Sequence, residues 1–336
     1  METRKVQRTG KSTFIVSLPK GWAVRNGIKP GSIVYITQGE SGDLILSPER
    51  TSQNLKVKLD IGDKSGEALI RDIIGCYLSG YRTIEVVSTH MTPEQKRCIH
   101  QIVSKLIGPE ILEETGNKVL IQDLLNSEEL QSDRALRRLR TVVRSMIQDA
   151  IDSLIGMKKS LAQDVIQRDD DVDRLNLLVS RQFTEMLRTG ALSQSSLDVI
   201  TAFNYALAAS NLERIADHAH TIAGLAIEHS MPVPEEMAVE LSRISAIIGG
   251  LIDEAISALL NRNTETANSI IERTKEIRRE AMRNLEPIIS SSSAEVNQEE
   301  IMMRMVVSSS IARFLDHIKN IGEFTINMTH AQLHNS

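Results

Sequence analysis

A hydrophobic pattern that occurs twice, 105 residues apart, constrains the fold of this 336-residue chain more than any other feature. TVVRSMIQDAIDSLI (141–155) aligns with AIIGGLIDEAISALL (246–260), and their apolar positions coincide. The same offset aligns DVIQRDDDVDRL (164–175) with SIIERTKEIRRE (269–280), and a third pair of segments follows at an offset of 99. All six segments have helical periodicity, so the repeat predicts two units of three long helices.

Two pairs of carboxylates lie in the first repeat. Glu213 and Asp217 are four residues apart in NLERIADHAHTIAGL, and Asp169 and Asp173 have the same spacing in the preceding helix. Residues four apart share one face of a helix. Two facing pairs would repel each other unless a cation joined them, and oxygen ligands suit Mg²⁺, Mn²⁺, Ca²⁺ or clustered iron. The alternative is a solvated acidic face, but the small residues around Glu213 indicate that another element packs over it and forms a recess.

The N-terminal fifty residues are basic, although the whole chain has a net charge of −5. They contain eight Lys and Arg against four Asp and Glu, which suggests a polyanionic partner, with a solvated basic surface as the alternative. TFIVSLP, KPGSIVYIT and LILSP are typical of short strands. This β unit has too little core to stand alone, so we expect it to interleave with a second copy. TGKST is not a nucleotide-binding loop, because a strand follows it instead of a helix.

VQRTGKSTFIVSLPKGWAVRNGIKPGSIVYITQGESGDLILSP, residues 6–48, resembles the SpoVT/AbrB swapped-hairpin domain in its SLPKGW step, its IKPGS turn and its closing hairpin. The resemblance implies an intertwined homodimer that presents basic residues to double-stranded DNA. The candidate contacts are Lys5, Arg8, Lys11 and Arg25. Lysine meets a phosphate as a point charge, whereas arginine can also fork onto a guanine edge.

Residues 51–130 read as βαβαββ, which predicts a small sandwich of the ferredoxin-like or ACT-like kind. One helix should begin at Thr92, with Pro93 at its first position and Gln95 completing a capping box. A hairpin should turn at Gly116 and Asn117. We expect this part to serve in dimerisation or as a spacer, with a small-ligand sensor as the alternative.

Residues 133–330 resemble the PhoU family of phosphate-uptake regulators, most specifically in VIQRDDDVDRL and NLERIADHAHTIA. The resemblance implies two three-helix bundles and a bound divalent or trivalent metal ion, such as Mg, Mn, Zn or Fe. The residues that match the family's acidic motif are Asp169, Asp173, Glu213 and Asp217.

Repeat two departs from this acidic motif. Thr274 and Arg278 replace the first carboxylate pair, and Ala312 replaces the Glu of the second pair, which leaves Asp316. We therefore expect one metal site and, in repeat two, an ion pair between Arg278 and Asp316.

Histidines and methionines near these motifs are expected to pack in the protein instead of binding metal. His218 and His220 do not share the line of Asp217 on their helix, so neither is expected to ligate. His218 should pack between helices, as should its repeat-two counterpart His317. Met302, Met303 and Met305 should fill the core.

The sequence thus predicts four parts: a swapped-hairpin domain (1–50), an α/β domain (51–130) and two helical bundles (131–230 and 231–336). We expect a DNA-binding transcriptional regulator of phosphate uptake and homeostasis, and no enzyme, because no nucleophile–base set is present. The alternative is an adaptor that acts on a phosphate transporter or a signalling kinase without binding DNA. No apolar run spans a membrane and the two cysteines form no framework, which favours the cytoplasm and excludes an integral membrane protein.

Overall fold

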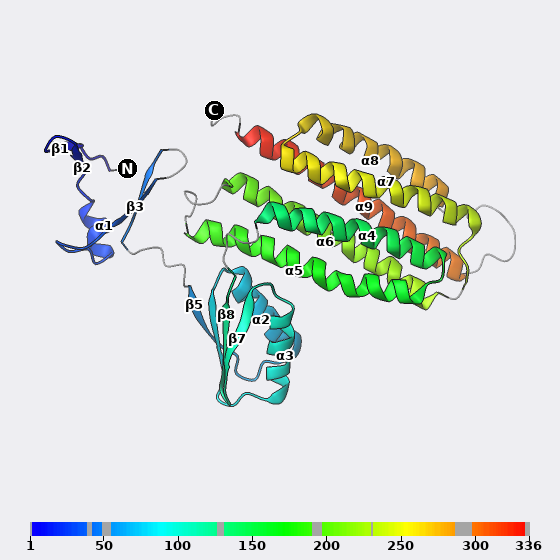
Figure 1. Ribbon diagram of the computed structural model, residues 1–336, viewed down its shortest axis with the longest axis horizontal. Coiled ribbons are helices and arrows are strands. Elements are labelled where there is room, and N and C mark those ends of the chain that lie inside the picture. The colour runs from blue at the N-terminus through cyan, green and yellow to red at the C-terminus, as the bar shows by residue number, and fades with distance from the viewer. Residues whose placement is uncertain are drawn as a thin grey trace. The chain divides into compact units, whose positions relative to one another are not determined.

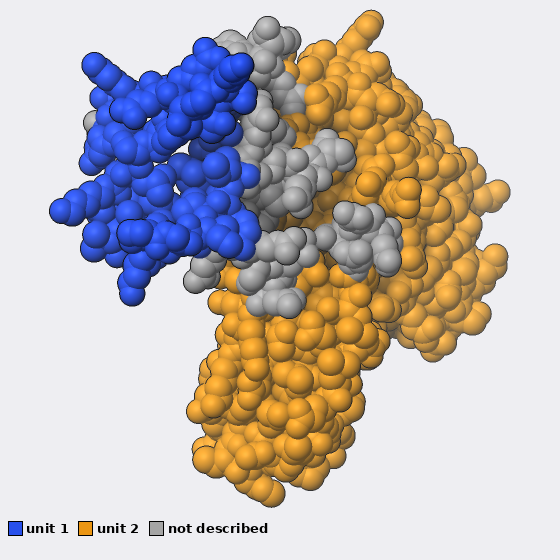
Figure 2. Space-filling view, turned by 60° about the vertical axis from the view of Figure 1, so that its left-hand side comes forward, with its two compact units in different colours: residues 1–53, 192–194 blue, residues 54–191, 195–336 orange. Residues whose placement is uncertain are grey.

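The computed structural model describes residues 2–38, 42–48, 55–125, 131–189, 197–229, 231–285 and 298–332. The chain forms two compact units, one of them built from the residues up to Gln53 and the other beginning at Asn54 (Figure 2).

The first unit consists of two separate hairpins and a short helix. Strands β1 (Gln7–Thr9) and β2 (Thr13–Ile15) pair antiparallel, as do β3 (Tyr35–Gln38) and β4 (Leu44–Ser47). Helix α1 (Lys20–Arg25) lies between the hairpins in the chain. The helix ends at Arg25, and Gly27 follows its C-cap Asn26 with a φ of +64°, a conformation that favours glycine. TGKST lies in the β1–β2 turn and leads into a strand, as predicted.

This unit has no core of its own among the residues described. None of its described side chains is buried, and apolar side chains lie exposed on both hairpins. Phe14 is 70% exposed and Ile36 is 62% exposed. Isolated two-stranded hairpins are marginal in water, so the described residues of this unit do not form a stable core by themselves.

The second unit begins with an α/β part whose order is βαβαββ, as predicted. The elements are β5 (Lys56–Asp60), α2 (Gly66–Leu78), β6 (Thr83–Val87), α3 (Pro93–Ser104), β7 (Pro109–Glu114) and β8 (Lys118–Asp123). The strand order is β5-β6-β8-β7, with β5 and β6 parallel and the other pairs antiparallel. The two strands of the βαβ unit are therefore neighbours. In a ferredoxin-like sandwich this unit is split, so that part of the prediction is wrong, although the two-layer α/β arrangement is present.

The core of the α/β part lies between the sheet and its two helices. Leu69 and Ile73 of α2 and Ile99 of α3 are buried together with Val86 and Val119 of the sheet. The start of α3 has the predicted capping box: the Thr92 hydroxyl accepts from the backbone N–H of Gln95, and the Gln95 side chain accepts from the backbone N–H of Thr92.

After Gln131, the described residues of the second unit form six long helices, three in each repeat as predicted (Figure 1). Repeat one contains α4 (Ser132–Ile155), α5 (Lys159–Thr189) and α6 (Val199–Glu228), and repeat two contains α7 (Glu235–Asn261), α8 (Thr264–Leu285) and α9 (Gln298–Gln332). One apolar core runs through both repeats, because α6 packs against α9 as well as against α4 and α5.

The methionines of α9 and the apolar composition of α7 are two further features of repeat two. Met303 is 1% exposed, but Met302 and Met305 are 65% and 60% exposed, so the expectation that all three fill the core is wrong for two of them. Helix α7 is long and apolar enough to cross a membrane by length and composition. However, 56% of its most apolar stretch is buried inside the bundle, which is the pattern of a core helix.

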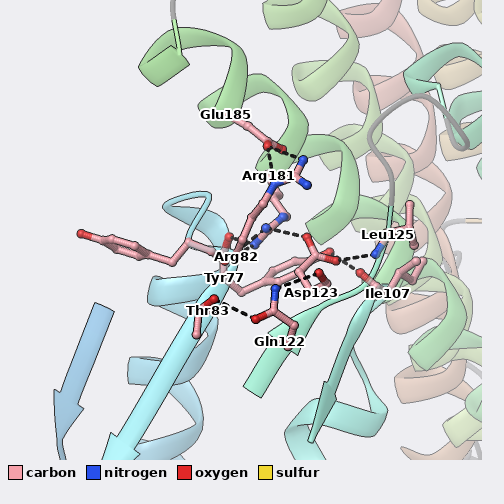
Figure 3. Close-up of polar contacts among 10 residues, drawn as sticks. Tyr77, Arg82, Thr83, Ile107, Gln122, Asp123, Leu125, Arg181 and Glu185 are labelled. Atoms are coloured by element: carbon pink, nitrogen blue, oxygen red, sulfur yellow. Dashed lines mark hydrogen bonds and ion pairs between the residues drawn. The ribbon is translucent and has the colours of Figure 1, made fainter. Parts of the chain in front are cut away.

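Helix α5 also joins the bundle to the α/β part (Figure 3). The Arg181 side chain donates to the carbonyl oxygens of Tyr77 and Tyr81, and its Nη2 lies 2.7 Å from Asp123 Oδ2. Only 3% of the Arg181 side chain and 8% of the Asp123 side chain are exposed. A second ion pair, between Arg82 and Glu185, joins the same two parts at 3.0 Å.

Candidate metal centre and nucleic-acid interface

The structure brings the four predicted carboxylates into one electrostatic neighbourhood on α5 and α6, which pack side by side. Partial burial, together with the charges of Asp169 and Asp217, raises the pKa of Asp173 to about 6. Partial burial and the charges of Asp217 and Asp173 raise the pKa of Glu213 to about 7. Carboxylates perturb each other in this way only when they lie close together.

The Asp169 side chain is largely enclosed, with 16% of it exposed. Its Oδ2 lies 2.8 Å from Nδ1 of His220, whereas its Oδ1 is buried and has no hydrogen-bond partner in the described chain. Burial raises the pKa of Asp169, although the bond to His220 opposes that shift. A buried acceptor without a partner is unusual in a folded protein and is one mark of an ion or water site.

The residues fit a hard cation by their chemistry, but they do not form a finished site. Within the described residues, no three His, Cys, Asp or Glu side chains converge on one point as ligands. The donor set is rich in oxygen, carries several negative charges and includes the unpartnered Asp169 Oδ1. A cation there would need side-chain rotation, which remains open to Asp173 and Asp217 because both are exposed.

The stripe of small residues around Glu213 is covered unevenly along α6, and Glu213 itself is half-buried. On the same stripe of α6, Thr221 is exposed and a Cβ added at Gly224 would meet open space. The end of the stripe at Thr221 and Gly224 therefore lies open, because which element covers a stripe depends on tertiary packing that local spacing does not encode.

The α/β part reaches the edge of this acidic neighbourhood. Lys105, just after α3, pairs with Asp170 at 2.7 Å, and its charge opposes the rise in the pKa of Asp173. Helix α5 therefore carries two of the four carboxylates, Asp169 and Asp173, as well as this contact and the buried Arg181.

Repeat two replaces the carboxylate cluster with an ion pair, as predicted. Arg278 Nη1 donates to Asp316 Oδ1, and Arg313 Nη1 lies 3.7 Å from the other oxygen of Asp316. Thr274 is buried, and its hydroxyl donates to the Ile271 carbonyl of its own helix. Ala312 is also buried.

His218 packs between helices as predicted, whereas His220 makes a contact that its spacing from Asp217 does not predict. The ring centroid of His218 lies 6.3 Å from that of His317 and 6.2 Å from that of Phe314. His220, in contrast, contacts a predicted ligand, Asp169. The missed signal is the seven-residue spacing from Glu213, which is close to two helical turns and places His220 on the Glu213 face.

The candidate DNA contacts lie in the first unit. Lys5 precedes β1, Arg8 lies within it, Lys11 occupies the β1–β2 turn and Arg25 ends α1. All four are exposed. Arg8 Nη2 donates to the Lys11 carbonyl, which ties the strand to its turn.

Comparisons with known proteins agree with this division of the chain. The family described as "PhoU domain" matches residues 136–226 and again residues 241–325, which together make up just over half of the chain. The family described as "Antidote-toxin recognition MazE, bacterial antitoxin" matches residues 7–54.

Individual relatives match the helical part. The phosphate-specific transport system accessory protein PhoU homolog of Pseudomonas aeruginosa is 24% identical over 187 residues, which cover 55% of this chain and 76% of that protein. The homolog from Clostridium acetobutylicum is 23% identical over 214 residues, which cover 62% and 93%. The crystal structure of PhoU from Pseudomonas aeruginosa aligns with a TM-score of 0.51 at 23% identity, over 60% of this chain and 96% of that one, and so shares its fold.

Proposed function

The chain belongs to the PhoU family and carries an AbrB-like domain at its N-terminus, and from this premise we propose that it is a cytoplasmic, DNA-binding transcriptional regulator of phosphate uptake and phosphate homeostasis. Its relatives are named as accessory proteins of a phosphate-specific transport system. The role is regulatory and not catalytic, as suits a family of accessory proteins.

The observation that carries the DNA-binding role is a basic hairpin unit that cannot bury its own apolar side chains. Val6, Phe14 and Ile33 are each more than 60% exposed, and Arg8 and Arg25 lie on short elements of the same unit. A second copy of the chain would cover the apolar residues. The resulting homodimer would carry two sets of Lys5, Arg8, Lys11 and Arg25, and the positive charge of these residues suits the phosphates of double-stranded DNA.

The bundles would supply the sensing function. Asp169, Asp173, Glu213 and Asp217 would hold one divalent or trivalent metal ion, such as Mg, Mn, Zn or Fe, whose charge would neutralise theirs. The support is the unpartnered Asp169 oxygen and the raised pKa values of Asp173 and Glu213. An effector of this kind changes DNA affinity only if it binds the two states of the protein unequally.

DNA binding is tested by its salt dependence. We expect the intact protein to bind its promoter duplex with a steep negative slope of log affinity against log salt. Replacing Lys5, Arg8 and Lys11 by Ala should flatten the slope by about 0.9 for each phosphate that is no longer neutralised. The matched control replaces three exposed lysines of the second unit, Lys58, Lys158 and Lys159, and should leave the slope unchanged. No duplex binding by the intact protein at low salt would contradict the proposal.

Dimer formation is tested separately by sedimentation equilibrium. Phe14→Asp and Ile36→Asp place a charge on the exposed apolar side chains of the two hairpins and should yield monomers. Leu112→Asp is the control, because Leu112 is 57% exposed but lies in the second unit. A wild-type protein that is monomeric at micromolar concentration would refute the proposed dimer.

The second candidate function is an adaptor that docks on a phosphate transporter or a signalling protein without binding DNA. The names of the relatives favour it, since they refer to a transport system. Under this alternative, the basic unit would bind an acidic protein surface. The variant at Lys5, Arg8 and Lys11 would then no longer bind that protein, and neither it nor the wild type would bind duplex DNA.

A further inference from the structure

His220 contacts the acidic cluster and has no place in the function described so far. Its Nδ1 lies 2.8 Å from Asp169 Oδ2, and 43% of its side chain is exposed. The contact crosses from α6 to α5, so it links the two helices that carry the four carboxylates. Because it occupies one Asp169 oxygen, it restricts rotation of that carboxylate.

The other Asp169 oxygen is the one left buried without a partner in the described residues. An unbonded buried acceptor is costly unless something else binds it. In many metal sites, a hydrogen bond to one oxygen of a carboxylate holds the other oxygen towards the ion, and such supporting residues strongly affect affinity.

Repeat two lacks the counterparts of both residues. The offset of 105 residues places Thr274 at the position of Asp169, and the offset of 99 places Lys319 at the position of His220. Lys319 pairs instead with Glu323 on its own helix, at 3.0 Å. The repeat that lacks the carboxylate therefore also lacks the histidine.

We propose that His220 is a positioning residue of the cation site, which holds Asp169 so that its buried Oδ1 stays free to bind a cation. The proposal rests on the cation site put forward above. It differs from direct ligation: Nδ1 is engaged with Asp169, and the ring orients an oxygen ligand without supplying a nitrogen ligand. Such a role strengthens the binding of hard and borderline cations alike.

The test measures binding of Mn²⁺ and of Mg²⁺ to the full-length protein by equilibrium dialysis and calorimetry. His220→Ala should weaken the affinity for both ions by about 10- to 100-fold. His220→Asn keeps a donor near the position of Nδ1 and should restore most of the affinity. Lys319→Ala, at the equivalent position of repeat two, should leave binding unchanged. The circular dichroism and melting midpoint of each variant establish that it is folded.

Two results would overturn the inference while leaving the cation site intact. One is wild-type affinity for both ions in His220→Ala. The other is loss of Mn²⁺ affinity with Mg²⁺ affinity unchanged, which would identify His220 as a nitrogen ligand. If the wild-type protein bound neither ion, the proposed cation site itself would fail, and this role of His220 with it.

Discussion

The buried ion pair between Arg181 and Asp123 should fasten the α/β part to the helical bundle, and Asp123→Ala tests this. Both side chains are less than a tenth exposed, and their charged atoms lie 2.7 Å apart. Removing one partner of a buried pair typically costs about 3–5 kcal/mol, because the other charge stays buried. Arg181 would keep its bonds to the carbonyls of Tyr77 and Tyr81, so we expect the lower end of this range, about 3 kcal/mol.

Segment-resolved hydrogen exchange is the suitable assay, because a chain of several parts need not unfold in one step. The free energy of opening of α2 and β8 should fall in Asp123→Ala. A double-mutant cycle with Arg181→Met should show a strong interaction energy between the two side chains. Asp72→Ala is the matched control. Its partner Lys64 is 53% exposed, and such surface pairs contribute only about 0–1 kcal/mol. A change below about 1 kcal/mol in Asp123→Ala would refute the argument, since the lower bound for a buried pair is about 3 kcal/mol.

Three further predictions concern the carboxylates of repeat one, a glycine of the α/β part and the metal content of repeat two. Burial and like charge raise the folded-state pKa values of Asp173 to about 6 and of Glu213 to about 7, so these two carboxylates should destabilise the metal-free protein increasingly as pH rises from about 4 to 7. Melting curves of the wild type and of the Asp173→Asn, Glu213→Gln variant across this range test the sign, and a wild-type midpoint that rises with pH relative to that of the variant would contradict it. Gly108→Ala should destabilise the α/β part by about 1–3 kcal/mol in urea unfolding, because φ is +102° and the new methyl group would clash with the carboxylate that pairs with the buried arginine. Gly116→Ala has open space and is its control. The wild-type protein should bind one site's worth of Mn²⁺ per chain and Asp316→Ala should leave that number unchanged, because Asp316 pairs with Arg278; a lower count in this variant would show that repeat two also binds metal.

Local patterns in the sequence are sufficient to predict several features of the fold. Apolar spacing predicts the six long helices, because a helix in a bundle must bury one face whatever its neighbours are. The capping box at Thr92 is predictable because it involves residues three apart. The Arg278–Asp316 pair follows from aligning the repeats, since equivalent positions in two similar bundles face the same neighbour.

The features that local patterns do not predict depend on non-local packing. Alternating apolar residues indicate that strands exist, but not that β8 lies between β6 and β7. The exposure of Thr221, Met302 and Met305 depends in the same way on how distant helices pack. His220 differs from these cases, because a local spacing does predict where it lies. It is offset from the line of Asp217 on the helix, but its seven-residue spacing from Glu213 places it on the acidic face.

The ion pair of repeat two has a consequence for how the two bundles would respond to their surroundings. The Arg278 guanidinium is a cation attached to the chain, so its supply does not vary with the ionic content of the cell and it cannot diffuse away. The Asp316 carboxylate is therefore neutralised under all conditions in which arginine stays charged. If repeat one depends on a diffusible cation, as proposed, only α5 and α6 change their charge balance when that ion is scarce. Helices α8 and α9 would then act as a constant reference within the same molecule, and any change in the helical part would begin on the helix that also contacts the α/β part.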